Sequence, residues 1–127
     1  MHDVTAAFET FIAAFNALDV ERFRRCLAPE VSLFAPCADG APLIEGAAAV
    51  EAHFAAVFRA EGPAGPEIRP MRVRVSALAP QAALVTFDFA RAHGSIGRRT
   101  LVFRRIGHDW RIAHIHASNT GAPREAA

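Results

Sequence analysis

The chain has 127 residues, of which 52% are apolar and 21% are charged, and its formal net charge is +1. A chain of this length and composition buries a core of its own, so we expect one globular domain with little disorder. The near-zero charge, without a basic stripe carrying interleaved aromatic residues, argues against nucleic-acid binding.

The sequence lacks the patterns expected of a secretory signal, a membrane span or a cysteine-based metal site. The start of the chain has no basic region followed by an apolar run, so we predict no secretory signal, and no apolar stretch reaches the length of a membrane span. Cys26 and Cys37 form neither a metal set nor a disulfide framework, and we expect reduced thiols. The prediction is a cytoplasmic protein with no membrane partner, with a single domain at 1–127, its core at about 4–119 and a flexible tail at 120–127.

Apolar residues spaced three and four apart predict three helices. They cover residues 4–18, 20 to about 28, and 47–60. Asp3 is expected to cap the first helix and Asp19 the second, which Pro29 should end. Clusters of Gly, Pro and Asp at 37–44 and 61–66 predict a turn or small hairpin and a loop.

Alternating apolar and polar residues predict one short strand and four longer ones. They cover 31–35, 69–78, 83–92, 98–106 and 110–118. The last two are joined by a short Gly107-containing turn, and the four form an antiparallel meander. Since helices must cover one face of such a sheet, we predict an α+β fold: three N-terminal helices packed on a curved antiparallel sheet in a cone-shaped roll.

The order of elements resembles the nuclear transport factor 2-like superfamily, in particular its SnoaL-like branch. The segments that carry the resemblance are 15–34, Glu45-Gly46 before the third helix, and 110–118. The last of these resembles the ending of the association domain of calcium/calmodulin-dependent kinases. The likeness covers roughly residues 4–119 and implies the cystatin-like cone fold, which ketosteroid isomerases share.

The resemblance implies a pocket between the helices and the concave sheet face, and pairing of two copies through the convex face. The expected pocket residues are Phe11, Phe15, Phe34, Phe54, Phe58, Val85, Phe87, Phe89, Leu101, Phe103, Ala113, Ile115 and Ala117. The expected homodimer interface contains Asp88, Arg104, Trp110, His114 and His116, with Val102 and Ile112 beside them. The alternation along the strands agrees with this division, since the first set is apolar and most of the second is polar.

Catalysis of the ketosteroid isomerase type is disfavoured by the residues present. The chain has no tyrosine, and Ala35 matches the position of the catalytic base. His53 on the third helix is then the best candidate acid or base, with Glu45 and Asp39 on the neighbouring loop. The simpler interpretation of all three is solvent-exposed or partly exposed polar residues.

The pair His114 and His116 allows three interpretations. The two side chains point to one side of a strand and could bind a metal with Asp88 from a neighbouring strand. They could instead belong to a catalytic cavity. We favour a dimer interface, in which Arg104 pairs with Asp88, and we expect no metal and no cofactor.

Anion binding in the pocket is not expected from the resemblance. Kinase association domains carry pocket arginines, but the matching positions here are Leu101, Ala117 and about Phe87. Arg91 and Arg105 at strand ends could meet a carboxylate at the rim, although solvated arginines are the simpler interpretation.

The sequence therefore predicts a homodimeric protein that binds a small hydrophobic or aromatic molecule in an apolar pocket walled by phenylalanines. One alternative is a cofactor-free cyclase, isomerase or dehydratase acting on a small hydrophobic carbonyl compound. A second is a dimeric assembly domain without a ligand.

Overall fold

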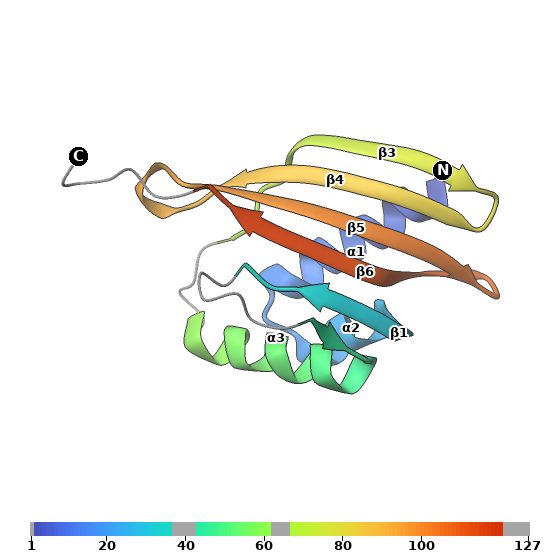
Figure 1. The fold of residues 1–127 in the computed structure, drawn as a ribbon, viewed down its shortest axis with the longest axis horizontal. Helices are drawn as coiled ribbons and strands as arrows, with labels where there is room; N and C mark the ends of the chain where they lie inside the picture. The colour runs from blue at the N-terminus through green and yellow to red at the C-terminus, as the bar shows by residue number, and fades with distance from the viewer. Residues whose placement is uncertain (1, 37–42, 62–66, 121–127) are drawn as a thin grey trace.

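One six-stranded sheet carries three helices in a computed structural model that describes residues 2–36, 43–61 and 67–120 (Figure 1). The helices are α1 (His2–Asn16), α2 (Val20–Arg25) and α3 (Ala47–Glu61). The strands are β1 (Leu27–Phe34), β2 (Ile44–Glu45), β3 (Met71–Ala79), β4 (Ala82–Ala90), β5 (Ile96–Ile106) and β6 (Asp109–Asn119), with a 3₁₀ turn at Ala92–Gly94. This is the predicted α+β class. Residues 37–42 of the turn predicted at 37–44, residues 62–66 of the loop predicted at 61–66 and residues 121–127 of the tail predicted at 120–127 lie outside the described residues.

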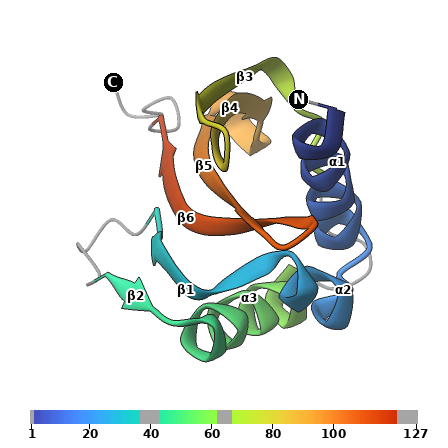
Figure 2. The same cartoon turned by 90° about the vertical axis from the view of Figure 1, so that its right-hand side faces the viewer.

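The sheet has the strand order β2-β1-β6-β5-β4-β3. Strands β3 to β6 form the predicted antiparallel meander. One pair of neighbours departs from the antiparallel pattern, because β1 pairs with β6 in parallel. A parallel neighbour needs a long crossover, and the chain between β1 and β6 supplies it. Figure 2 shows the sheet curving around α1, with α3 against β1.

The first two helices are positioned by their apolar faces and by a cap. Val4, Phe8 and Phe11 on α1 are buried against the sheet. The Asp19 side chain accepts a hydrogen bond from the Arg22 backbone N–H at 3.1 Å, which confirms it as the cap of α2. Asp3 does not cap α1, because it already lies in the first turn of that helix.

The second helix is shorter than predicted. It ends at Arg25, and β1 starts at Leu27, so Pro29 lies inside a strand rather than after a helix. Pairing with β6 is irregular between Leu27 and Ser32. A proline that lacks an N–H is tolerated at such an irregularity.

A β-bulge in β6 changes which side chains face the core. Phe103 pairs with Ile112, whereas Val102 pairs with His114, so Ala113 is the extra residue. Ile112 is fully buried in the core, and its predicted place on the convex face is wrong. Ala113 is half-buried at the bulge and is absent from the cavity wall described below.

The third strand is largely exposed. Val75 packs against the core, but Met71 is 40% and Val73 42% exposed, although all three are the apolar residues of an alternating pattern. β3 is an edge strand, and its pairing with β4 shifts between Met71 and Arg74. Arg72 sits at this shift with φ of 53°, so simple alternation fails there.

Candidate functional site

A small cavity of about 120 Å³, enclosed over most of its wall, lies between the helices and the concave face of the sheet. Its wall is mostly apolar and includes two side chains that carry chemistry, His53 and Arg99. The other lining residues are Phe11, Phe15, Leu33, Pro36, Phe54, Val57, Ile68, Phe87, Leu101, Ile115 and Ala117. An enclosed apolar space with few polar groups is the usual form of a small-molecule site.

The cavity is narrow because aromatic rings fill most of the interior. Phe23 packs on Phe54 with ring centroids 4.6 Å apart, and Phe15 and Phe58 meet edge-on at 5.3 Å. An apolar cavity of about 150 Å³ is known to accept benzene. The free space here therefore has the size of a single ring and is far below that of a steroid.

The predicted pocket residues divide into three groups. Those that line the cavity are Phe11, Phe15, Phe54, Phe87, Leu101, Ile115 and Ala117. Phe58, Val85, Phe89 and Phe103 are buried in the core without lining it. Phe34 and Ala113 are elsewhere: Phe34 is 42% exposed, and its ring lies 5.6 Å from His114 and 5.3 Å from His116 on the outer face. The prediction of Phe34 as a pocket residue is wrong because it ends β1 pointing away from the helices.

His53 is half-buried on α3, and its ring meets the Phe54 ring edge-on at 5.2 Å. Burial lowers the pKa of His53 below its ordinary value. The imidazole is therefore neutral near pH 7 and could accept a proton. Glu45 lies exposed on β2 and is absent from the cavity wall, and Asp39 lies outside the described residues.

Arg99 is the charged cavity residue that sequence reasoning missed, and the apolar wall residues Leu33, Pro36, Val57 and Ile68 were also not predicted. It stands opposite Phe87 on β4 and Ala117 on β6, so it faces inward between two cavity residues. Its Nη1 donates to the carbonyl oxygens of Arg98 and Ser118 and to Asn119 Oδ1, at 2.9, 3.0 and 3.1 Å. The sequence contained the information needed to place it, because alternation along β5 puts Arg99 on the same side as Leu101.

A second hollow of about 340 Å³ adjoins the cavity. The two spaces share Phe15, Val57, Ile68 and Arg99 in their walls. The rim of the second includes Glu67 and Arg91. Arg91 donates to Ser95 Oγ at 2.9 Å and does not enter the cavity wall.

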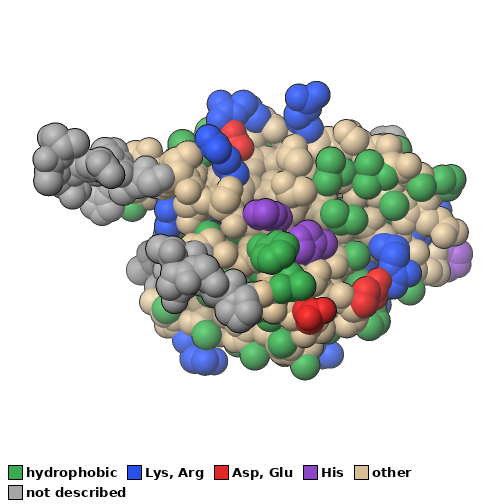
Figure 3. Space-filling model, viewed as in Figure 1, with side chains coloured by type: hydrophobic (Ala, Val, Ile, Leu, Met, Phe, Trp, Pro, Cys, Tyr) green, Lys and Arg blue, Asp and Glu red, His purple; other side chains and the backbone are tan. Residues whose placement is uncertain are grey.

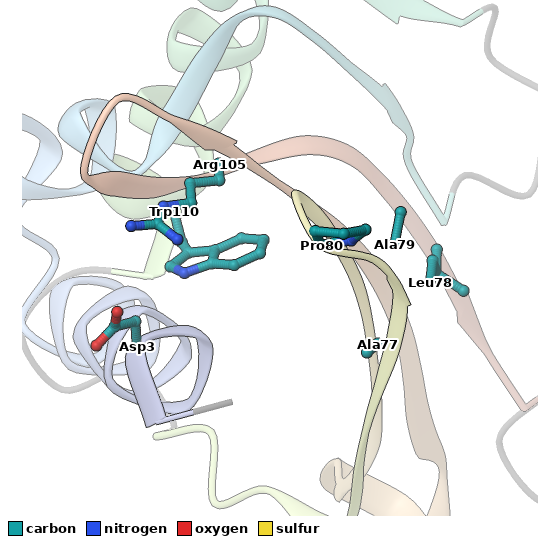
Figure 4. A pocket seen from close by; sticks show the side chains of 7 residues that line it. All are labelled: Asp3, Ala77, Leu78, Ala79, Pro80, Arg105 and Trp110. Carbon is teal, nitrogen blue, oxygen red and sulfur yellow. The ribbon is translucent and has the colours of Figure 1, made fainter.

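Two larger hollows lie at Trp110, near the start of β6 and away from the cavity. The larger, of about 720 Å³, is open to solvent, and Figure 4 shows the Trp110 indole between Asp3 on α1 and the turn at Pro80. The other, of about 500 Å³, also contains Asp3, with Cys26 and Arg111. Trp110 therefore lies beside α1, and its predicted place on the convex face is wrong. Arg105 lines the first hollow, and its Nε donates to the Gly107 carbonyl oxygen at 3.3 Å.

The outer face of the sheet carries both strand histidines. His114 Nδ1 and Ser32 Oγ are 2.7 Å apart, and the rings of His114 and His116 lie beside Phe34. Figure 3 shows histidine and hydrophobic side chains together on this face. Burial and the neighbouring His116 lower the pKa of His114.

The predicted pairing of Arg104 with Asp88 is wrong. Arg104 Nε donates to Glu30 Oε2 at 2.6 Å, and Asp88 Oδ2 accepts from Arg72 Nε at 2.7 Å. The reason is the strand register, because Asp88 lies opposite Arg98, six residues along β5 from Arg104.

Within the described ranges, no three His, Cys, Asp or Glu side chains are placed to hold a metal ion. Among those residues no helix is long and apolar enough to cross a membrane.

A comparison with known protein families shows to which family the chain belongs. The sequence pattern of the SnoaL-like domain matches residues 4–123. The chain belongs to the SnoaL-like domain family. No protein with a curated description matches this SnoaL-like chain.

Solved structures show the same fold. A proposed dehydratase of the NTF2-like family from Streptomyces avermitilis superimposes with a TM-score of 0.80 at 22% identity, covering 95% of this chain and 96% of the other. An NTF2-like protein of unknown function from Pseudomonas putida KT2440 gives 0.81 at 21%, with 92% and 84% covered. A protein with a cystatin-like fold from Caulobacter vibrioides gives 0.78 at 18%, with 94% and 89% covered. At these identities the likeness concerns the fold of the SnoaL-like domain alone.

Proposed function

We propose that this SnoaL-like protein binds a small aromatic or hydrophobic molecule in the cavity between α1, α3 and the sheet. The observation that carries the proposal is the enclosed space of about 120 Å³ with an apolar wall. Removing a single ring from water into such a space is favourable, because it replaces hydration by close apolar contact. The ligand that fits has one ring, in contrast to polycyclic substrates.

Toluene tests this proposal because it carries no polar group. We expect saturable binding of toluene by ligand-observed NMR or calorimetry. Ala117→Leu should abolish it by filling the cavity, since Ala117 is 6% exposed and lines the wall. Ala48→Leu adds the same volume at an exposed site on α3 and should leave binding unchanged. Absence of binding to the wild-type protein, or equal binding by Ala117→Leu, would contradict the proposal.

An enzyme acting on an acidic C–H is the second candidate. It is favoured by His53, whose lowered pKa leaves a neutral imidazole at the cavity wall. A general base at this site would catalyse solvent deuterium exchange into the methyl group of acetophenone. His53→Gln should remove the catalysed exchange, and His108→Gln at the exposed β5–β6 turn should not. No catalysis by the wild-type protein would leave binding alone as the function.

Homodimer formation through the outer face accompanies both candidates in our proposal. The supporting observation is the exposed ring of Phe34 beside His114 and His116 on the outer face of the sheet. Apolar and aromatic side chains at the centre of a face suit a self-complementary interface. Sedimentation of wild-type protein and of Phe34→Glu should then give a dimer and a monomer respectively, and a wild-type monomer would contradict it.

A further inference from the structure

The guanidinium of Arg99 has no negative partner in the described part of the chain. Its hydrogen-bond acceptors there are two backbone carbonyls and the Asn119 amide, all uncharged, and no ion pair involves it. All three bonds use Nη1. The Nε and Nη2 donors have no acceptor among the described residues. They are not sealed off either, since no side-chain nitrogen or oxygen in that part is both fully buried and unpartnered.

The same contacts hold the guanidinium in one place. The Arg99 Cζ lies 4.7 Å from the centroid of the Phe89 ring, which supports it from one side. The three bonds from Nη1 tie the guanidinium to the start of β5 and the end of β6. A charged side chain that is anchored by uncharged groups, with two donors left over, is prepared for a ligand that brings the negative charge.

The position of Arg99 relates this charge to the apolar cavity. Arg99 borders both the enclosed space of about 120 Å³ and the adjoining hollow of about 340 Å³. A ring held in the first space would therefore have the guanidinium at the boundary with the second. In the second hollow, Arg91 adds a further positive charge, and Glu67 Oε1 lies 3.7 Å from Arg69 Nη2.

The charge persists at neutral pH. Burial and the neighbouring Arg91 lower the pKa of Arg99 to about 10, which is still well above 7. A cation partly withdrawn from water without a counter-charge is costly, and a bound carboxylate offsets that cost.

We propose that the site selects single-ring aromatic carboxylates, with the ring in the apolar cavity and the carboxylate on Nε and Nη2 of Arg99. This inference rests on the proposed binding function and names its ligand class. It also replaces the expectation that the pocket lacks anion-binding character: the arginine positions matched by Leu101 and Ala117 are apolar, but the charge enters two residues earlier in β5.

The test compares phenylacetate with phenylacetamide, which has nearly the same shape but no charge, by calorimetry on the full chain at pH 7.5. We expect phenylacetate to bind at least about tenfold more tightly, as charge-assisted hydrogen bonds typically give. Arg99→Met, which keeps volume and removes charge, should abolish that preference while changing the amide affinity less than about threefold. Arg98→Gln, on the exposed opposite side of β5, should keep it.

Each outcome bears on the inference. Equal or tighter binding of the amide by wild-type protein overturns it, as does a preserved preference in Arg99→Met. If that variant does not fold, Arg99→Lys replaces it, because it keeps the charge but loses the paired donors and should reduce the preference. Toluene binding without phenylacetate binding overturns the carboxylate inference and leaves the cavity function standing. Binding of none of the three probes overturns both.

Discussion

The contact between Gly97 and Phe89 leaves no room for a side chain at position 97. A Cβ atom built on Gly97 would lie less than 3.0 Å from three carbons of the Phe89 ring. Phe89 is only 7% exposed and its ring lies under Arg99, so it has little room to move. An aromatic ring lying over a strand glycine is a known way to fill the space that glycine leaves.

Gly97→Ala should therefore destabilise the protein by about 1–3 kcal/mol, as overpacking typically does. Urea unfolding measures this change. In a Phe89→Leu background the same substitution should cost clearly less, because the ring that the methyl group strikes is gone. Additive effects of the two substitutions would contradict the contact.

Among single residues, the apolar residues of the cavity wall could be predicted from the sequence better than the polar ones. The inward phenylalanines follow from alternation and helical spacing. Arg99 was missed because strand arginines are usually solvated, whereas its burial comes from tertiary packing, which includes the Phe89 ring. Phe34 was misplaced because it is the last residue of its strand, where alternation is weakest as a guide.

Two hydrogen bonds of the Asn16 side chain join the end of α1 to the segment before β3. Asn16 Nδ2 donates to the Ile68 carbonyl oxygen at 2.9 Å, and the Ile68 N–H donates to Asn16 Oδ1 at 2.8 Å. Ile68 is buried and borders both hollows next to Arg99. The pair therefore fixes one wall of the site to the end of α1.

Asn16→Ala should lower the free energy of unfolding by about 2 kcal/mol, since two part-buried hydrogen bonds are lost and the Ile68 backbone keeps two unsatisfied groups. Chemical denaturation gives the value. Thr10→Ala, at an exposed position on the same helix, should change stability by less than about 0.5 kcal/mol. An Asn16→Ala effect no larger than this control would show that the pair does not hold the junction.

Helices and meander strands could be predicted because each has its own periodicity, and the Asp19 cap because it is a local motif. The β6 bulge could not be, since two arrangements of 110–118 keep an alternating pattern. Only packing of Ile112 in the core distinguishes them. The start of β1 at Leu27 was not predicted, because a proline such as Pro29 after a helical pattern usually marks the end of the helix.

We expect the free energy of unfolding to depend on pH through two histidines. The pKa values of His53 and His114 are both lowered in the folded protein, chiefly by burial. Below the ordinary value of 6.5 the unfolded chain therefore binds more protons than the folded one. Their contribution to stability is complete above 6.5 and is lost as pH falls toward the folded-state pKa values.

Urea unfolding between pH 7.5 and 5.0 should show this loss. His53→Gln and His114→Gln should each reduce the drop in stability over that range, whereas His108→Gln, at an exposed turn, serves as the control and should leave it unchanged. A drop as large as that of the wild-type protein in both variants would contradict the assignment.

The order of elements and the SnoaL-like family could be inferred from the sequence, because they depend on patterns spread over the whole chain. The size of the cavity could not. The cavity volume is the small difference between the space enclosed by the sheet and helices and the volume of the aromatic rings packed in it. No sequence pattern predicts that difference.

A titration of methyl-labelled protein with phenylacetate, followed by NMR, shows whether an aromatic carboxylate enters the cavity beside Arg99. We predict saturable shifts in the methyl groups of Leu101, Ile115 and Ile68, together with the Arg99 Nε–H signal. Shifts confined to the Trp110 indole and Leu78, or shifts that rise without saturating, would place the ligand outside the cavity and contradict the account.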